Sequence, residues 1–482
     1  MIEMKLMRAI FYPLALSLAM FAGSSCPVSA TVRLPAILGS HMVLQQKAPV
    51  SFWGWANPAE KIRIMTDWDN TVYDTTADGG GQWQVRVQTP AAGGPYKVIV
   101  NGANAIVLED VMIGEVWVCS GQSNMEWSGD QGVPQSLEEA PRATNPRIRF
   151  FSIPKTTADT PQDRSEGSWK VCSPEEMVHF SAVGYFFGKQ LNRELGAPIG
   201  LIGSNWGGTP AEVWTPRDVV QSDAELRDAA GKLQSFAWWP KDPGKCFNAM
   251  IYPITKFKIA GAIWYQGESN AGTAYAYEKL FRAMISAWRA AWGEEFPFYF
   301  VQIAPFAYDK AGIGALLREA QTKSAAHPNT GMVVVSDLVD DVKNIHPVNK
   351  QAVAKRLANW ALAKTYGRKG IAYESPVYKR MAIEGDKIRI SFDHAEDGLQ
   401  VSKGEPTEFF IAGADQKFMP AKATIEGSQV VVSSDKVSQP VAVRFGFSNT
   451  AMPNLFSKAG LPVNLFRTDD WKVETGAPGP VQ

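Results

Sequence analysis

Four polar segments of the sequence each follow a short apolar run. In the segment 120–124, Ser123 stands two residues after Gly121, a glycine that permits a sharp turn, where a hydroxyl is displayed as a nucleophile; Ser120 is the alternative. In the second segment, the paired glycines Gly207 and Gly208 let backbone N–H groups approach a ligand closely. N–H groups placed in this way stabilise an oxyanion, so the two segments suit acyl transfer.

The third and fourth segments supply amide, carboxylate and imidazole groups. Gln266 and Asn270 offer amide donors on either side of Glu268. His346 follows Asp341 and the aspartate before it, and an imidazole with an ordinary pKa of about 6.5 is the natural base for a serine hydroxyl. A carboxylate is needed to hold its other ring nitrogen. The sequence therefore contains candidates for a nucleophile, oxyanion donors, a base and an orienting acid.

Two other functions use overlapping residues. Glu126 and Glu268 are candidates for the paired carboxylates of a glycosidase. In a non-catalytic glycan-binding protein, β domains and exposed tryptophans would hold glycans and the serine would be inert. The complete set of Ser123, Gly208 and His346 favours an enzyme, and hydrolysis of a simple aryl acetate distinguishes it from the binding protein.

The composition restricts the partners and cofactors. The 482 residues include 48 Lys+Arg against 48 Asp+Glu, so no basic excess indicates nucleic acid or an anionic membrane surface as a partner. The five histidines are scattered and the cysteines form no C-x-x-C pair, so we expect no zinc site. Three of the cysteines, Cys119, Cys172 and Cys246, can form at most one disulfide and are typical of small buried residues.

Alternating strands and helices are expected to position the four polar segments. Apolar runs predict strands at 115–119, 198–204, 260–265, 298–303 and 332–336. Apolar residues at four-residue spacing predict helices at 181–195, 277–288, 316–326 and 347–366, the last with Pro347 in its first turn. This alternation predicts a parallel sheet covered on both faces, with ligands at the carboxyl ends of its strands.

Turn-rich stretches flank this α/β unit. Short strand-like runs separated by Gly, Asn and Pro are typical of antiparallel β domains. We therefore predict an N-terminal β domain, a catalytic domain, a C-terminal β domain and a flexible tail, at 31–112, 113–369, 370–473 and 474–482.

The first thirty residues have the pattern of a secretory signal peptide. Lys5 and Arg8 precede an apolar run at 9–22, and small residues end at Ala30 in an A-x-A-like cleavage site. The run is too short to span a bilayer and contains Pro13. We expect cleavage near Ala30, a secreted or periplasmic protein, and no membrane association after cleavage.

These segments make the sequence similar to the SGNH hydrolases, and within them to the sialate O-acetylesterase-like carbohydrate esterases. The resemblance covers nearly the whole mature chain and is carried, in the family's order, by 114–127, 205–209, 264–270, and 345–347 with Asn349 and Lys350. It implies an α/β fold with the SGNH-type three-layer α/β/α parallel sheet, flanked by N-terminal and C-terminal β-rich, sandwich-like regions.

The resemblance implies a secreted carbohydrate esterase that hydrolyses O-acetyl esters on sugars, as sialate 9-O-acetylesterases do, through a serine acyl-enzyme and without a cofactor. An acetylxylan-type esterase of the same fold is the alternative. Ser123 is then the nucleophile and His346 the base. The implied oxyanion donors are the N–H groups of Ser123 and of Gly207 or Gly208, with an amide from Gln266 or Asn270.

The orienting acid departs from the family's pattern. Many SGNH enzymes have an aspartate three residues before the histidine, where this sequence has Lys343. Asp341, Asp340 and Glu268 are the alternatives. We favour Glu268, because it lies within a segment that matches the family.

Overall fold

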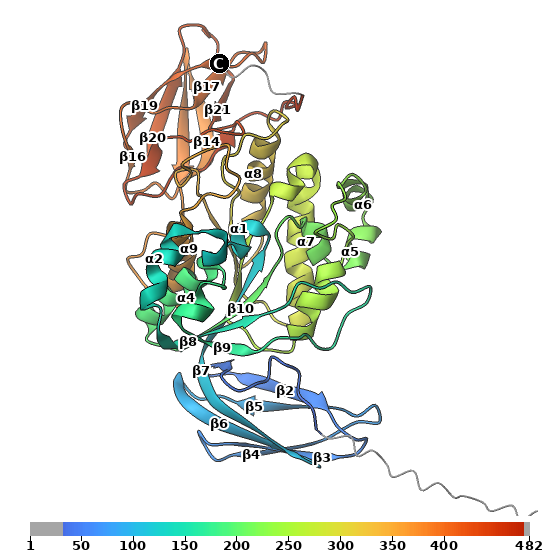
Figure 1. The fold of residues 1–482 in the computed structure, drawn as a ribbon. Coiled ribbons are helices and arrows are strands. Elements are labelled where there is room, and N and C mark those ends of the chain that lie inside the picture. The colour runs from blue at the N-terminus through green and yellow to red at the C-terminus, as the bar shows by residue number, and fades with distance from the viewer. Residues whose placement is uncertain (1–31, 477–482) are drawn as a thin grey trace, which may run out of the picture.

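The computed structural model describes residues 32–476. They form three regions arranged end to end: an N-terminal β region, a central α/β region and a C-terminal β region (Figure 1). The predicted signal peptide at 1–30 therefore lies outside the described residues, and so does most of the predicted tail at 474–482. Within the described part of the chain, no helix has both the length and the apolar run needed to cross a membrane.

The central sheet has the strand order β13-β12-β11-β7-β10-β8-β9, and all neighbours are parallel except β9, which runs antiparallel to β8. The strands are β7 (Ala105–Gly121), β8 (Asn145–Ser152), β9 (Trp169–Cys172), β10 (Ile199–Asn205), β11 (Gly261–Tyr265), β12 (Phe298–Val301) and β13 (Thr330–Val333). The five predicted strands lie within or overlap β7, β10, β11, β12 and β13. Strands β8 and β9 were not predicted.

Helices cover both faces of this sheet (Figure 1). The helices α4 (Ala182–Leu195) and α9 (Lys350–Trp360) pack on one face, and α7 (Ala274–Trp292) and α8 (Ile313–Ser324) pack on the other. Because side chains alternate along a strand, Tyr265 of β11 packs in the core under α4 and α9, and Trp264 packs in the core under α7 and α8. The shorter helices are α1 (Ser123–Glu126), α2 (Pro134–Glu139), α3 (Pro174–Met177), α5 (Arg217–Ser222) and α6 (Ala224–Gly231).

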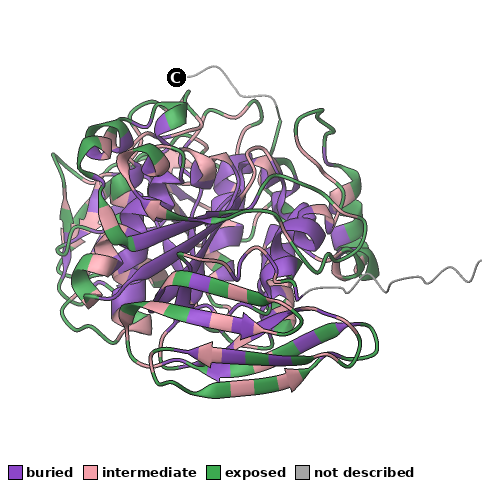
Figure 2. Cartoon of the chain, turned by 60° about the horizontal axis from the view of Figure 1, so that its bottom comes forward, coloured by how far each residue is buried: buried purple, intermediate pink, exposed green. Residues whose placement is uncertain are grey.

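The N-terminal β domain is joined to the central sheet by one uninterrupted strand. Residues of β7 alternate between exposed and buried in its first part and are all buried from Val111 to Gly121, where the strand enters the central sheet (Figure 2). The predicted domain boundary at 112 thus falls inside β7. The other strands of this domain are β1 (Val43–Gln45), β2 (Pro49–Trp55), β3 (Lys61–Thr66), β4 (Val72–Thr76), β5 (Gln82–Gln88) and β6 (Gly93–Asn101).

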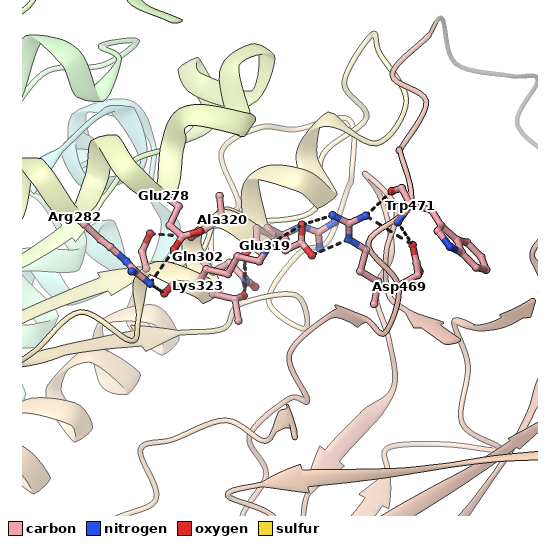
Figure 3. Close-up of polar contacts among 12 residues, drawn as sticks. Glu278, Arg282, Gln302, Glu319, Ala320, Lys323, Asp469 and Trp471 are labelled. Atoms are coloured by element: carbon pink, nitrogen blue, oxygen red, sulfur yellow. Dashed lines mark hydrogen bonds and ion pairs between the residues drawn. The ribbon is translucent and has the colours of Figure 1, made fainter. Parts of the chain in front are cut away.

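The C-terminal β domain packs against α8. Arg467 forms a two-pronged ion pair with Glu319 of α8, at 2.8 and 3.0 Å, and Figure 3 shows Glu319 facing the Asp469 and Trp471 segment. The strands are β14 (Val377–Glu384), β15 (Lys387–Asp393), β16 (Leu399–Val401), β17 (Phe409–Ala412), β18 (Met419–Pro420), β19 (Lys422–Glu426), β20 (Gln429–Ser433), β21 (Ala442–Phe445), β22 (Leu455–Ser457) and β23 (Phe466–Arg467).

The structure corrects the start of the last predicted helix and shows the state of the three cysteines. The last helix begins at Lys350 after an N-cap at Asn349, whose side chain accepts a hydrogen bond from the Ala352 N–H, so Pro347 precedes the helix instead of lying in its first turn. The three cysteines of the described chain are all free and buried.

Candidate active site

The turn that presents Ser123 depends on a glycine. Strand β7 ends at Gly121, which has φ +136°, and a Cβ atom there would lie 2.2 Å from the carbonyl oxygen of Tyr265. Only glycine fits this close crossing of two strands. Helix α1 then starts at Ser123, whereas the alternative nucleophile, Ser120, is fully buried within β7.

The structure brings Ser123 and His346 into hydrogen-bond contact. Ser123 Oγ lies 2.9 Å from His346 Nε2, although the two residues are 223 positions apart. The imidazole stacks on the indole of Trp127 with a centroid distance of 4.1 Å and an interplanar angle of 25°. Nδ1 of His346 makes no hydrogen bond within residues 32–476. The geometry is that of a nucleophile and its general base.

The environment of His346 keeps its imidazole neutral. Burial, together with the nearby charge of Lys350, lowers the pKa of His346 to about 4. The ordinary pKa of about 6.5 that the sequence suggested is therefore too high for this site. A neutral Nε2 can accept the serine proton over the whole physiological pH range.

None of the three predicted acids forms a hydrogen bond or ion pair with His346 in the described part of the chain. Asp341 is exposed, and its carboxylate accepts a hydrogen bond from the backbone N–H of Lys343 at 2.8 Å, within its own turn. Asp340 is also exposed. Glu268 is buried and accepts its hydrogen bond from Asn124. The expected direct contact between a carboxylate and the imidazole is therefore absent from the described residues.

Glu268 instead belongs to a buried network beneath the catalytic pair. Asn124 Nδ2 donates to Glu268 Oε1 at 2.6 Å and to the carbonyl oxygen of Ile345 at 3.0 Å. Lys350 Nζ donates to Asn124 Oδ1 at 2.5 Å, and Lys350 is fully buried. Glu268 is thereby linked, through one amide, to the residue that immediately precedes His346.

Burial shifts both charged groups of this network towards neutrality. It lowers the pKa of Lys350 to about 7, and the negative charge of Glu268 opposes that shift. It also raises the pKa of Glu268, which the hydrogen bond from Asn124 and the charge of Lys350 partly offset. The two groups stabilise each other's charged form across Asn124.

The glycine loop after β10 lies against Ser123. A Cβ atom on Gly207 would be 3.4 Å from the Cβ atom of Ser123. The Gly207 N–H already donates to Glu126, whose other oxygen pairs with Lys155 at 2.6 Å. The N–H of Gly208, a residue with φ +80°, makes no hydrogen bond within the described chain. Gly208 is thus the better oxyanion donor of the two.

The two amides predicted at the oxyanion are already engaged. Gln266 Nε2 donates to Asn270 Oδ1 at 2.7 Å, and Asn270 Nδ2 donates to the buried Glu212 at 2.9 Å. Both side chains have no exposed surface. They hold the third segment against the glycine loop, because Asn270 Oδ1 also accepts from the Ala211 N–H at 2.9 Å. Their prediction as oxyanion donors does not fit this geometry.

Three residues of the site were not assigned from the sequence. Asn124 and Lys350 lie within the matching segments, but a lysine in an amphipathic helix and an asparagine in a turn are usually exposed. Trp127 also lies in a matching segment, and its contact with His346 depends on two distant loops meeting. Their position in these segments was the one available signal.

The three-layer fold and the Ser123–His346 pair at the carboxyl ends of its strands define a serine hydrolase of the α/β class. Residues 113–363 match the family described as "Carbohydrate esterase, sialic acid-specific acetylesterase". The chain belongs to this family of carbohydrate esterases.

Individual relatives agree with this assignment. The chain is 27% identical to the sialate O-acetylesterase of Rattus norvegicus, covering 83% of this chain and 86% of the relative, and 27% identical to that of Homo sapiens, covering 90% and 91%. Among solved structures, a carbohydrate acetylesterase from Xanthomonas citri is 39% identical over 92% of this chain and 100% of that one, with a TM-score of 0.84. The predicted family and α/β fold are confirmed.

Proposed function

We propose that this carbohydrate esterase removes O-acetyl groups from sugars with Ser123 as nucleophile and His346 as base. The observation that carries the proposal is the 2.9 Å contact between Ser123 Oγ and His346 Nε2. Glu126 and Glu268, the carboxylates considered for a glycosidase, are each engaged elsewhere, Glu126 with Lys155 and Glu268 with Asn124. An esterase is also what membership of the family requires.

The proposal assigns a group to each step of the reaction. Nε2 of His346 takes the proton of Ser123 as Oγ attacks the acetyl carbonyl, and the N–H groups of Gly208 and Ser123 stabilise the oxyanion. The intermediate collapses, and the departing sugar oxygen takes the proton from the imidazolium. Water, deprotonated by His346, then attacks the acetyl-enzyme, releases acetate and regenerates the serine. No cofactor takes part in these steps.

Glu268 acts as a positioning residue in this proposal. It holds Asn124, and Asn124 in turn holds the Ile345 carbonyl next to His346. The imidazolium formed during the reaction lies over the face of Trp127, whose negative quadrupole stabilises a cation. These contacts support a Ser–His pair that works without a carboxylate on Nδ1.

The proposed substrate sugar is one of two kinds. The mammalian relatives are named sialate O-acetylesterases, so O-acetylated sialic acid is one candidate, and an acetylxylan-type glycan is the other.

We propose that residues 1–30 are a signal peptide cleaved near Ala30 and that the mature protein is secreted or periplasmic, with neither nucleic acid nor membrane as a partner.

A substrate screen tests the proposal. Purified mature protein is incubated with 4-nitrophenyl acetate, 9-O-acetyl-N-acetylneuraminic acid and acetylated xylo-oligosaccharides, and the released acetate is measured. We expect turnover of the aryl ester and of at least one sugar ester, and a loss of at least a thousandfold in the folded Ser123→Ala variant. Wild-type rates in that variant would reject Ser123 as the nucleophile.

A further inference from the structure

A cleft of about 510 Å³ opens at the glycine loop and at the segment that carries Glu268. Its lining includes Gly208 and Glu268 together with the aromatic residues Phe236, Trp239 and Tyr308. Gly208 directly follows Gly207, which packs on Ser123, so the cleft starts within one residue of the nucleophile's neighbour. Glu268, another lining residue, accepts a hydrogen bond from Asn124, which directly follows Ser123.

Phe236 and the half-buried Trp239 line the cleft, and Trp238, which does not line it, packs against them. Phe236 is 38% exposed and Trp238 is 65% exposed. Trp239 lies 4.4 Å from Phe236 and 5.3 Å from Trp238 between ring centroids. Exposed apolar groups at this density mark a binding surface more often than they serve stability. We call residues 236–239 the aromatic loop.

The aromatic loop is fixed to the glycine loop of the active site. A Cβ atom on Gly208 would come within 2.1 Å of the Trp239 ring, so the indole lies directly on this glycine. Trp206 Nε1 donates to the carbonyl oxygen of Trp238 at 3.1 Å. The rings are thus held at a set position relative to Gly208 and Ser123.

The cleft also has a polar part, which the C-terminal domain positions. Asp309 and Lys310 line the cleft, are exposed, and form no ion pair within the described residues. Asn449 holds their loop, because its Nδ2 donates to the Lys310 carbonyl at 2.7 Å and its Oδ1 accepts from the Gly314 N–H at 2.9 Å. A fixed polar edge and a fixed aromatic surface therefore line the same cleft.

We propose that this cleft is a sugar subsite in which the pyranose ring of the substrate stacks on Phe236 and Trp239 while its acetyl group reaches Ser123 past Gly208. A pyranose has an apolar face of C–H groups, which suits the negative face of an aromatic ring, and a rim of hydroxyls, which suits Asp309 and Lys310. The inference rests on the proposed function and names the residues that select a sugar ester over a simple one.

The test compares a sugar ester with an ester that has no sugar. The kcat/KM values of 9-O-acetyl-N-acetylneuraminic acid and of acetylated xylo-oligosaccharides are each divided by that of 4-nitrophenyl acetate. In Phe236→Ala, we expect this ratio to fall about tenfold for the sugar ester that the wild type prefers, because the stacked ring is lost. Comparison of the two sugar esters shows whether the cleft prefers an anionic sugar, the sialic acid, or a neutral one, the xylo-oligosaccharide.

Tyr252→Ala is the matched control. Tyr252 is an exposed aromatic residue, 41% accessible, that does not line the cleft, so its replacement should leave the ratio unchanged. In a catalytically inactive Ser123→Ala background, the preferred sugar ester should quench or shift tryptophan fluorescence, and adding Phe236→Ala should weaken its binding about tenfold.

The outcomes separate the two proposals. Turnover of 4-nitrophenyl acetate with no turnover of either sugar ester would overturn the proposed function and the subsite together. Turnover of a sugar ester with the same ratio in Phe236→Ala as in the wild type would overturn the subsite alone. A ratio that falls equally in Tyr252→Ala would also reject it, since the effect would then not belong to the cleft.

Discussion

Replacing Lys350 by methionine removes the buried ammonium that lies beneath the catalytic pair. The charge of Lys350 contributes to the lowered pKa of His346, and the pKa of Lys350 itself is about 7. Lys350 is therefore mostly charged at the acid pH values where His346 titrates. We expect the Lys350→Met variant to have a higher His346 pKa than the wild type, while burial, the larger cause of the shift, remains.

The expected pH dependence of kcat/KM follows from the titration of His346 alone. With a pKa of about 4 for His346, about 0.9 of the imidazole is neutral at pH 5, so wild-type kcat/KM should be nearly the same at pH 5 and pH 7. An ordinary pKa of about 6.5 would leave only about 0.03 neutral at pH 5. In Lys350→Met, the rise of kcat/KM with pH should have its midpoint between about pH 4 and about pH 6.5.

The same variant should lose stability. Lys350 Nζ is the donor to Asn124 Oδ1, and Asn124 is fully buried. Methionine leaves that oxygen without this donor, which destabilises the fold by about 1–3 kcal/mol. Urea unfolding at pH 7 measures the difference. Lys355→Met is the control, because Lys355 is exposed on the same helix.

The assay is the initial rate of acetate release from subsaturating 4-nitrophenyl acetate between pH 3.5 and 8. Under these conditions kcat/KM reports the ionisation of the free enzyme. A wild-type limb near pH 6.5 would refute the argument that burial keeps His346 neutral. A limb in Lys350→Met that is unchanged or lower than in the wild type would refute the electrostatic contribution of Lys350.

Two further predictions concern the positioning acid and the turn before the nucleophile. Glu268→Gln should lower kcat about tenfold or more, because the network that positions the catalytic pair loses its charge, whereas Asp341→Asn should have a small effect; the reverse ranking in steady-state kinetics would transfer the role to Asp341. Gly121→Ala should destabilise the protein more than Gly132→Ala in urea unfolding, because both have positive φ but only the Cβ at 121 meets the Tyr265 carbonyl, at 2.2 Å; equal losses would refute the steric argument.

The local sequence was sufficient for five strands of the central sheet and for the proposal of Ser123 and His346. Apolar runs located β7, β10, β11, β12 and β13, since a parallel sheet covered on both faces requires strands that are apolar throughout. Ser123 and His346 were found because their neighbours along the chain, a glycine turn and a helix start, display side chains at strand ends. These signals act within a few residues and are therefore readable from the sequence.

Only the tertiary structure decided what each polar side chain contacts. Glu268 and Asp341 were equivalent as carboxylates in the sequence, but folding buries Glu268 on Asn124 and leaves Asp341 in solvent. Gln266 and Asn270 were plausible donors until folding paired them with each other. The partners of Glu268 and His346, Asn124 and Ser123, lie more than a hundred positions away along the chain. The burial that lowers the pKa of His346 and the shape of the cleft likewise have no local signature in the sequence.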